Sequence, residues 1–251
     1  MSKPSQASHR SLTVPVIVAV SLAAITAALF LLPRSGDNGS LAASGQPAAA
    51  GSTAAATQGA AQPTEDRFSA LARRDPEDAM ALGKVDAPVV LIAYSEFQCP
   101  FCGKFARDTE PELVKKYVDT GVLRIEWRDF PYLGPESMTA ALAGRAAGEQ
   151  GRFWAFHDAL YRNQLPPNSG RLTTDYLVGI ATKVGLDVAK FKADMGSPTT
   201  KGGVERDFIE GQNIGVTGTP AFLVNGQPIM GAQPTATFEQ AIDQAAARAG
   251  R

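Results

Sequence analysis

The hydrophobic residues of this 251-residue chain are distributed in three different ways along its length. Residues 12–32 form an uncharged apolar run, and about 20 helical residues rising about 1.5 Å each match a hydrocarbon core of about 30 Å. This length predicts a transmembrane anchor, because the apolar region of a cleaved signal peptide is only about 7–15 residues long. The alternative is that the run belongs to a signal peptide that is cleaved on its C-terminal side.

The charges on either side of this run predict an orientation. Lys3, Arg10 and the amino terminus precede it, whereas Arg34 behind it is offset by Asp37. Positive residues favour the cytoplasmic side of a membrane. We therefore expect residues 1–11 in the cytoplasm and the C-terminal part outside the cell membrane; if the run is cleaved, the protein is secreted or periplasmic.

Residues 33–74 have few branched apolar side chains, and residues 35–62 are dominated by Gly, Ala, Ser, Thr and Gln. Such a segment cannot bury enough surface to offset the entropy of ordering it. It predicts a flexible tether. The remaining residues, 75–251, are numerous enough for one domain with its own core.

Within residues 75–251 the apolar pattern changes period several times. A continuous apolar run predicts a strand buried on both faces, and an alternating run predicts a half-buried strand. Helical spacing then dominates until two short strands joined by Asn-Gly, which favours a two-residue hairpin turn, and a last helix. These elements are residues 88–94, 122–128, 136–213, 221–224 with 227–230, and 238–248. The order predicts an α/β fold.

Charge and composition exclude one class of function. Lys plus Arg number 24 and Asp plus Glu number 25. A protein that binds nucleic acid through phosphates needs a basic excess. We therefore expect no nucleic-acid partner.

Both cysteines of the chain, Cys99 and Cys102, lie directly behind the buried strand. A crosslink that closes so short a loop stabilises a fold little, so the pair indicates chemistry. Pro100 suits the first position of a helix, which makes Cys99 the N-cap residue. Backbone amides, the helix dipole and Lys104 then favour the Cys99 thiolate. This predicts Cys99 as the accessible, acidic nucleophile and Cys102 as the covered, resolving thiol.

Two other interpretations of the cysteines fit the sequence less well. A zinc site usually needs four ligands, and the only histidines, His9 and His157, do not complete the usual set, so we expect no metal. A passive disulfide is disfavoured by the short loop. His157 lies among aromatic residues on a predicted helix, which favours a packing role.

The CPFC sequence behind an apolar strand, the helical stretch and GVTGTPAFLVNG together resemble a DsbA-like thiol-disulfide oxidoreductase of the thioredoxin superfamily, in its membrane-anchored bacterial form. The resemblance covers residues 75–251. It implies a thioredoxin fold with a helical insertion at about 135–213, between the second strand and the hairpin. It also implies a cis bond between Thr219 and Pro220 beside the cysteines.

A cis bond at this turn exposes backbone groups of Thr219, to which an extended substrate peptide could add as a strand. Without the resemblance, an ordinary trans turn before Pro220 is the preferred interpretation.

Two positions depart from the family pattern. Many members carry a buried acid six residues before the first cysteine, where this chain has Ala93; its nearest acid is Glu96. Proton transfer at Cys102 then uses Glu96, water or no fixed group, and the sequence leaves these three open. The pair Pro100-Phe101 between the cysteines lacks the histidine of the strongly oxidising relatives, so a weaker oxidant is expected.

Three functions stay open on the sequence. The first is an oxidase, free of cofactors, that passes its disulfide to secreted or envelope protein thiols and is re-oxidised by a DsbB-like or vitamin K epoxide reductase-like membrane partner. The second is a reductase or isomerase, although no dimerisation domain is present. The third is a non-enzymatic binding module with an inert disulfide. The redox direction depends on a few kcal/mol, because about 30 mV corresponds to about 1.4 kcal/mol for this couple, and the sequence does not resolve it.

Overall fold

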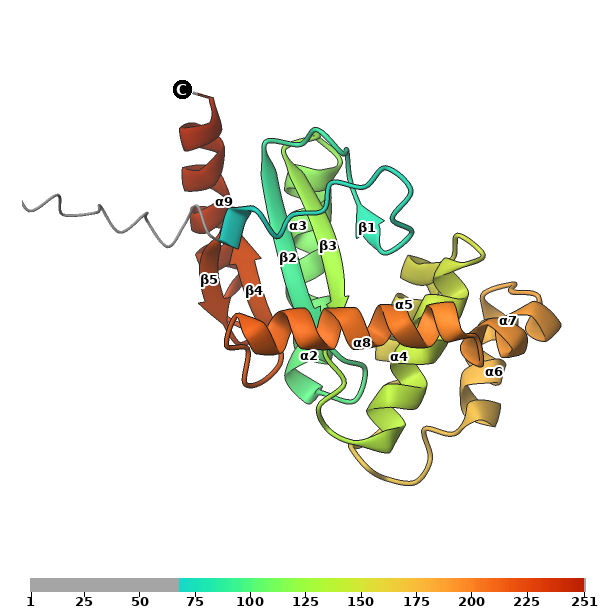
Figure 1. The fold of residues 1–251 in the computed structure, drawn as a ribbon. Helices are drawn as coiled ribbons and strands as arrows, with labels where there is room; N and C mark the ends of the chain where they lie inside the picture. The colour runs from blue at the N-terminus through green and yellow to red at the C-terminus, as the bar shows by residue number, and fades with distance from the viewer. Residues whose placement is uncertain (1–67, 251) are drawn as a thin grey trace, which may run out of the picture. The chain divides into compact units, whose positions relative to one another are not determined.

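The computed structural model describes residues 68–250, so the predicted anchor at 12–32 and most of the predicted tether lie outside the described residues. Across 68–250 there is no helix with the length and apolarity that a membrane crossing requires. The elements, in chain order, are β1 Ala81–Leu82, β2 Val89–Ser95, α2 Pro100–Lys104, η1 Phe105–Thr109, α3 Glu110–Leu113, η2 Val114–Val118, β3 Leu123–Asp129, α4 Pro135–Gly148, α5 Phe153–Arg162, α6 Thr174–Lys183, α7 Val188–Met195, α8 Pro198–Asn213, β4 Ala221–Val224, β5 Gln227–Met230 and α9 Thr235–Ala249 (Figure 1).

The strands form one mixed sheet in the order β1-β3-β2-β4-β5. β2 and β3 run parallel, and the other neighbours pair antiparallel. The predicted hairpin is confirmed, because Asn225 and Gly226 have φ of 44° and 87° and connect β4 to β5. The α/β thioredoxin fold with a helical insertion is therefore correct.

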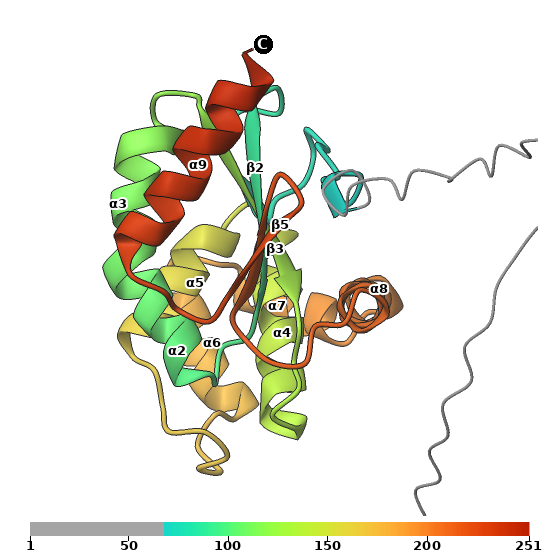
Figure 2. The same ribbon diagram turned by 90° about the vertical axis from the view of Figure 1, so that its left-hand side faces the viewer.

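Strand β2 is buried on both faces, as its continuous apolar run predicts. Val89, Leu91 and Ala93 point to the core formed with the helical segments η1 to η2 and α9, whereas Val90 and Ile92 point to the opposite face. Figure 2 shows α3 and α9 on one side of the sheet and α8 on the other. The end of β2 therefore lies between two helical layers, which fixes the turn that follows it.

The insertion consists of the helices α4 to α8, between β3 and β4. Its apolar side chains form a core cluster that also includes Phe97, Cys99, Cys102 and Trp127. The inserted helices thus pack directly against the cysteine-bearing turn. Helix α8 leaves this cluster and crosses the sheet (Figure 1).

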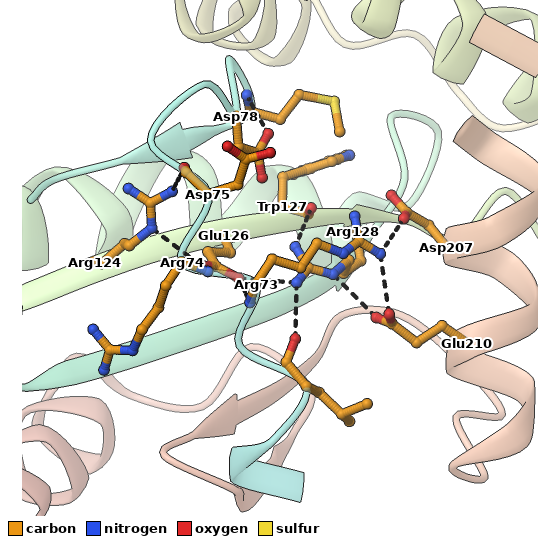
Figure 3. Close-up of polar contacts among 12 residues, drawn as sticks. Arg73, Arg74, Asp75, Asp78, Arg124, Glu126, Trp127, Arg128, Asp207 and Glu210 are labelled. Carbon is orange, nitrogen blue, oxygen red and sulfur yellow. Dashed lines mark hydrogen bonds and ion pairs between the residues drawn. The ribbon is translucent and has the colours of Figure 1, made fainter. Parts of the chain in front are cut away.

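The prediction that residues 122–128 form a half-buried strand is wrong in one respect. All seven residues of β3 are buried, including Arg124, Glu126 and Arg128. The alternation is real, but the charged face is covered by α8 and by residues 71–75 (Figure 3). Charged side chains enter an interior only when ion pairs and hydrogen bonds satisfy them.

Glu126 is the centre of this buried network. Its carboxylate accepts hydrogen bonds from the backbone N–H groups of Arg73 and Arg74, at 3.0 and 2.9 Å. It also accepts bonds from Arg124 Nε at 3.0 Å and from Arg128 Nη2 at 2.9 Å. All four donors point at one carboxylate, so Glu126 joins the N-terminal segment to the sheet.

The folded unit begins before the boundary predicted at residue 75. Leu71 O accepts a bond from Arg128, and Arg73 Nη2 pairs with Asp207 Oδ1 at 2.6 Å. Arg74 Nη1 donates to Val85 O at 2.9 Å. Residues 71–74, assigned to the tether by composition, are therefore hydrogen-bonded to the domain.

Candidate functional site

The cysteines lie in the tight turn between β2 and the helix that follows it. Cys99 is the N-cap residue, with φ −67° and ψ 119°, and Pro100 begins α2. The Cys102 N–H donates to Cys99 Sγ at 3.4 Å. The predicted cap geometry is confirmed, and it comes from the proline and the three-residue spacing.

Both cysteines are free thiols, with exposed fractions of 3% for Cys99 and 1% for Cys102, so Cys102 is covered as predicted but the predicted accessibility of Cys99 is wrong for this reduced form. A hydrogen bond from the Cys102 thiol, together with contacts from Thr219 and the amides of Cys102 and Phe101, lowers the pKa of Cys99 to about 6. Burial raises the pKa of Cys102 well above its usual value. The site thus holds one stabilised thiolate beside one protonated thiol.

Cys99 should therefore titrate far below an ordinary thiol. The thiolate is the reactive form, so alkylation of the reduced protein by iodoacetamide should rise through a transition near pH 6 and involve Cys99 alone. Cys102 should stay unmodified until the pH exceeds 9, because burial suppresses its ionisation. Mass spectrometry of the alkylated cysteines across pH measures both transitions.

A Cys102→Ser variant is the control, since serine retains a hydroxyl donor to Cys99 while removing the second thiol. Its transition should stay well below that of a free cysteine. Modification of Cys102 before Cys99, or a wild-type transition above about 8, contradicts the assignment.

The reduced form of the protein should be stabilised by this thiolate in a pH-dependent way. A pKa lowered from 9.0 to about 6 contributes stability that is complete above 9 and is lost as the pH falls through 6. With solvent screening, the contribution at pH 7 is on the order of 1 kcal/mol, or about 20 mV. The cap therefore makes the disulfide easier to reduce.

The Thr219-Pro220 turn lies against the reactive cysteine. The bond between these residues is cis, and Cys99 Sγ lies 3.2 Å from Thr219 O, to which it donates when it is protonated. Thr219 Oγ1 is buried and has no hydrogen-bond partner in residues 68–250. Two segments 120 positions apart in the chain thus meet at one sulfur.

Glu96 is buried next to the turn, and the insertion holds it there. Ser137 of α4 donates a short hydrogen bond to Glu96 Oε2 and accepts one from Gln98 Nε2 at 2.8 Å. Gln98 Oε1 accepts from the Asn168 N–H at 2.7 Å. Burial raises the pKa of Glu96 to about 7, to which the negative charge of Cys99 also contributes. The acid can therefore gain or lose a proton near neutral pH.

Other contacts of the turn carry no sequence signal that marks them. Gln164 Nε2 donates to Phe97 O at 3.0 Å and to Cys99 O at 2.9 Å. Tyr161 Oη donates to Glu96 O at 3.0 Å. A single Tyr near the end of a helix, or a single Gln just after it, matches no motif. Only the tertiary structure therefore shows that Tyr161 and Gln164 support the turn.

Two further residues singled out from the sequence face solvent. Lys104 pairs with Asp108 Oδ2 at 2.7 Å, so its charge is directed along the helix and not toward Cys99. Phe101 is 64% exposed and places an apolar ring on the surface beside Cys99. Exposed rings at such a position suit contact with a protein partner.

Comparison with known proteins gives the family. A family model described as thioredoxin (Thioredoxin_4) matches residues 75–244. The probable disulfide bond formation protein D of Bacillus cereus is 35% identical over 150 residues, which cover 58% of this chain and 69% of that protein. The match to residues 75–244 includes both cysteines, the insertion and the cis turn.

Solved structures agree with this match. Oxidised BdbD from Bacillus subtilis superposes with a TM-score of 0.63 and 25% identity, over 67% of this chain and 92% of that chain. Wolbachia pipientis alpha-DsbA1 gives a TM-score of 0.65 at 24% identity, over 72% and 97%, which shows a shared fold. With its Cys99-Cys102 pair at the N-cap, the chain therefore belongs to the DsbA-like thiol-disulfide oxidoreductases of the thioredoxin superfamily.

Proposed function

We propose that this oxidoreductase works as an oxidase that forms disulfide bonds in secreted or envelope proteins. The observation that carries the proposal is the N-cap position of Cys99, whose sulfur accepts a hydrogen bond from the Cys102 N–H, because a thiolate stabilised in this way is a good leaving group and makes the Cys99-Cys102 disulfide readily reducible. The relative in Bacillus cereus has disulfide bond formation in its name. A reductase or isomerase with the same fold would be favoured by a less stable Cys99 thiolate, because its disulfide would then be harder to reduce.

The reaction has two exchange steps. A substrate thiolate attacks Cys99 Sγ of the disulfide, which forms a mixed disulfide and releases Cys102 as the leaving sulfur. A second substrate thiolate then attacks the substrate sulfur, which forms the product disulfide and releases the Cys99 thiolate. Two electrons pass to the enzyme, and Cys102 takes up a proton. In the reverse direction Cys99 attacks and Cys102 resolves the mixed disulfide.

Glu96 is the proposed proton carrier for Cys102. Its carboxyl titrates near pH 7, and its Oε1 is buried without a hydrogen-bond partner among residues 68–250. A buried acid with a free oxygen next to a thiol pair can deliver the proton that the leaving sulfur takes up. Pro100 and Phe101 are proposed to adjust the reduction potential of the Cys99-Cys102 pair, Pro100 through the helix cap and Phe101 through its exposed ring.

Thr219 and Pro220 are the proposed docking site for the substrate backbone. In the described part of the chain, no group accepts a hydrogen bond from the Thr219 N–H. An extended peptide could pair with it by strand addition, which binds backbone and tolerates many sequences.

The proposed location is the outer side of a cell membrane, with residues 12–32 as anchor. The re-oxidant would then be a DsbB-like or vitamin K epoxide reductase-like partner in the same membrane. Protease added outside should release a domain that includes residues 71–74, because those residues are hydrogen-bonded to the sheet.

The equilibrium reduction potential tests the direction. We expect a value between about −120 and −200 mV in glutathione buffers, weaker than the strongest oxidants but well above the −270 mV of thioredoxin. The oxidised protein should also restore activity to a reduced, unfolded ribonuclease. A potential near −270 mV would support the reductase, and failure to exchange with glutathione would support the inert binding module.

A further inference from the structure

A second cluster of titratable side chains joins α3 to α5, outside the thiol site. It consists of Glu110, His157 and Asp158, each of which offers one ligand atom, and these atoms lie within 4.8 Å of one another. His157 Nδ1 is 3.0 Å from Asp158 Oδ1 and 3.9 Å from Glu110 Oε1. The thiol chemistry proposed above does not use any of the three.

Glu110 is turned inward where the helix changes its winding. Segment η1 is a π-helical turn whose last hydrogen bond joins the Glu110 N–H to Phe105 O. The extra residue of such a turn rotates the positions that follow it, and π turns are frequent at functional sites. As a result an acidic side chain faces α5 and the interior.

The Glu110 carboxylate is not compensated where it lies. Its residue is 7% exposed, and in the structure of residues 68–250 no donor forms a hydrogen bond with it. An anion that has lost water without gaining donors is costly. The missing hydrogen-bond donor within residues 68–250 is a second sign, beside the cluster itself, that the group lacks a partner.

His157 is held in a fixed orientation by rings. Its centroid lies 5.3 Å from that of Trp127, 5.1 Å from that of Trp154 and 4.8 Å from that of Tyr161. This confirms the packing role predicted for the residue. It also leaves Nδ1 directed at the two carboxylates, so the ring is preorganised as a ligand.

The cluster opens to a cavity. Glu110 and Asp158 both line a hollow of about 670 Å³ between the helices that contain them. Arg162 Nη1 lies 3.8 Å from Asp158 Oδ2 at this surface, and both side chains of that pair are about half-exposed or more. A cation would enter from this side and replace Arg162 as the partner of Asp158.

We propose that Glu110, His157 and Asp158 bind a divalent transition-metal cation of the Zn²⁺ type. One imidazole nitrogen and two carboxylates suit Zn²⁺, Co²⁺ or Mn²⁺, whereas Ca²⁺ and Mg²⁺ favour oxygen ligands alone. Two negative charges would neutralise the cation, and the cavity leaves room for water as a further ligand. The Asp158 side chain is half-exposed, so it can rotate and bring its carboxylate to the same cation as the other two ligand atoms.

The expectation from the sequence that no metal is bound rested on the cysteines and the two histidines. It did not include Glu110, because a position 47 residues before His157 is brought to that ring only by the fold. The proposed site takes neither cysteine as a ligand and leaves the thiol reaction unaltered.

The test uses the purified full chain with Cys99 and Cys102 oxidised, so that no thiolate competes for metal. The chain's two tryptophans, Trp127 and Trp154, both contact His157. Bound Co²⁺ should therefore quench most of the tryptophan fluorescence, with one cation per chain. Zn²⁺ at about a hundredfold excess over its Kd should raise the Tm by about 5 °C or more.

Glu110→Gln and Asp158→Asn should each weaken Co²⁺ binding by at least roughly tenfold, the loss that even an outer-shell change causes. Glu110→Gln should fold normally without metal, since it removes an uncompensated buried charge. The matched controls are Asp108→Asn, an exposed acid of the same helical segment, and His9→Gln, the other histidine; both should bind as the wild type does.

Absence of both quenching and a Tm shift in the wild type overturns the proposal. Binding that survives in Glu110→Gln and Asp158→Asn, or that falls equally in Asp108→Asn, overturns it as well, because the cation then lies elsewhere.

Discussion

Replacing Cys102 with serine should cause covalent complexes between this protein and its substrates to accumulate. Cys99 keeps its cap hydrogen bond from the residue 102 N–H, so it can still attack a substrate disulfide. The thiol that resolves the mixed disulfide is gone, so release slows by several orders of magnitude. The measurement is a non-reducing gel of envelope proteins captured on the variant, followed by release with reductant.

The matched variant is Cys99→Ser. Because burial keeps Cys102 protonated, this variant should capture nothing and lose essentially all exchange activity. Equal capture by both variants, or capture by neither, would contradict a two-step exchange through Cys99 and favour an inert disulfide.

Glu126→Ala should destabilise the protein by about 3–5 kcal/mol. The side chain is fully buried, and its removal leaves Arg124 without its carboxylate partner and Arg128 with Glu210 as its remaining one. Removing one partner of a buried ion pair typically costs this much, because the other charge stays uncompensated. Urea unfolding of the wild type and the variant measures the loss, at an unchanged m-value if both unfold in two states.

Glu126→Gln separates charge from packing. It keeps the volume but removes the charge and turns amide hydrogens toward the arginine donors, so most of the loss should remain. Glu112→Ala, on an exposed helical position, should change stability by less than about 0.5 kcal/mol. Losses below about 1 kcal/mol in both Glu126 variants would show that the network contributes little.

The Glu126 contribution should also depend on pH. Burial alone would raise the pKa of this carboxyl, but hydrogen bonds from the backbone of Arg73 and Arg74 and from Arg128 lower it below 4.5. Its stabilisation is therefore complete above 4.5 and is lost as the pH falls through the lower, folded-state pKa. The difference between wild type and Glu126→Gln should shrink in that acidic range.

Local patterns determined a large part of the fold. The continuous run before Cys99 predicted β2, Asn225-Gly226 predicted the hairpin turn, and helical spacing placed the insertion. Strand period, turn conformation and capping depend on neighbours within about four residues. The N-cap position of Cys99 follows from Pro100 and the three-residue spacing, so sequence alone was sufficient to predict that position.

The burial of the charged face of β3 was decided only by tertiary structure. The alternation in residues 122–128 shows which side chains share a face, but not whether that face meets water. Glu210 of α8 pairs with Arg128, and the backbone N–H groups of residues 73 and 74 bond to Glu126, so these distant groups let both charges enter the interior. Burial of charge depends on these distant donors and acceptors, which have no fixed spacing in the chain.

The same distinction applies to the site. Sequence placed two thiols at a helix end, because a cap is a local structure. The groups that set their protonation are distant in the sequence. Ser137 bonds to Glu96, 41 positions away, and Thr219 O lies against Cys99, 120 positions away. Glu110 and His157 are likewise joined only by the packing of two helices. Hydrogen bonds and desolvation act through space, so the chemistry of these groups was fixed by the folded arrangement and not by their order in the chain.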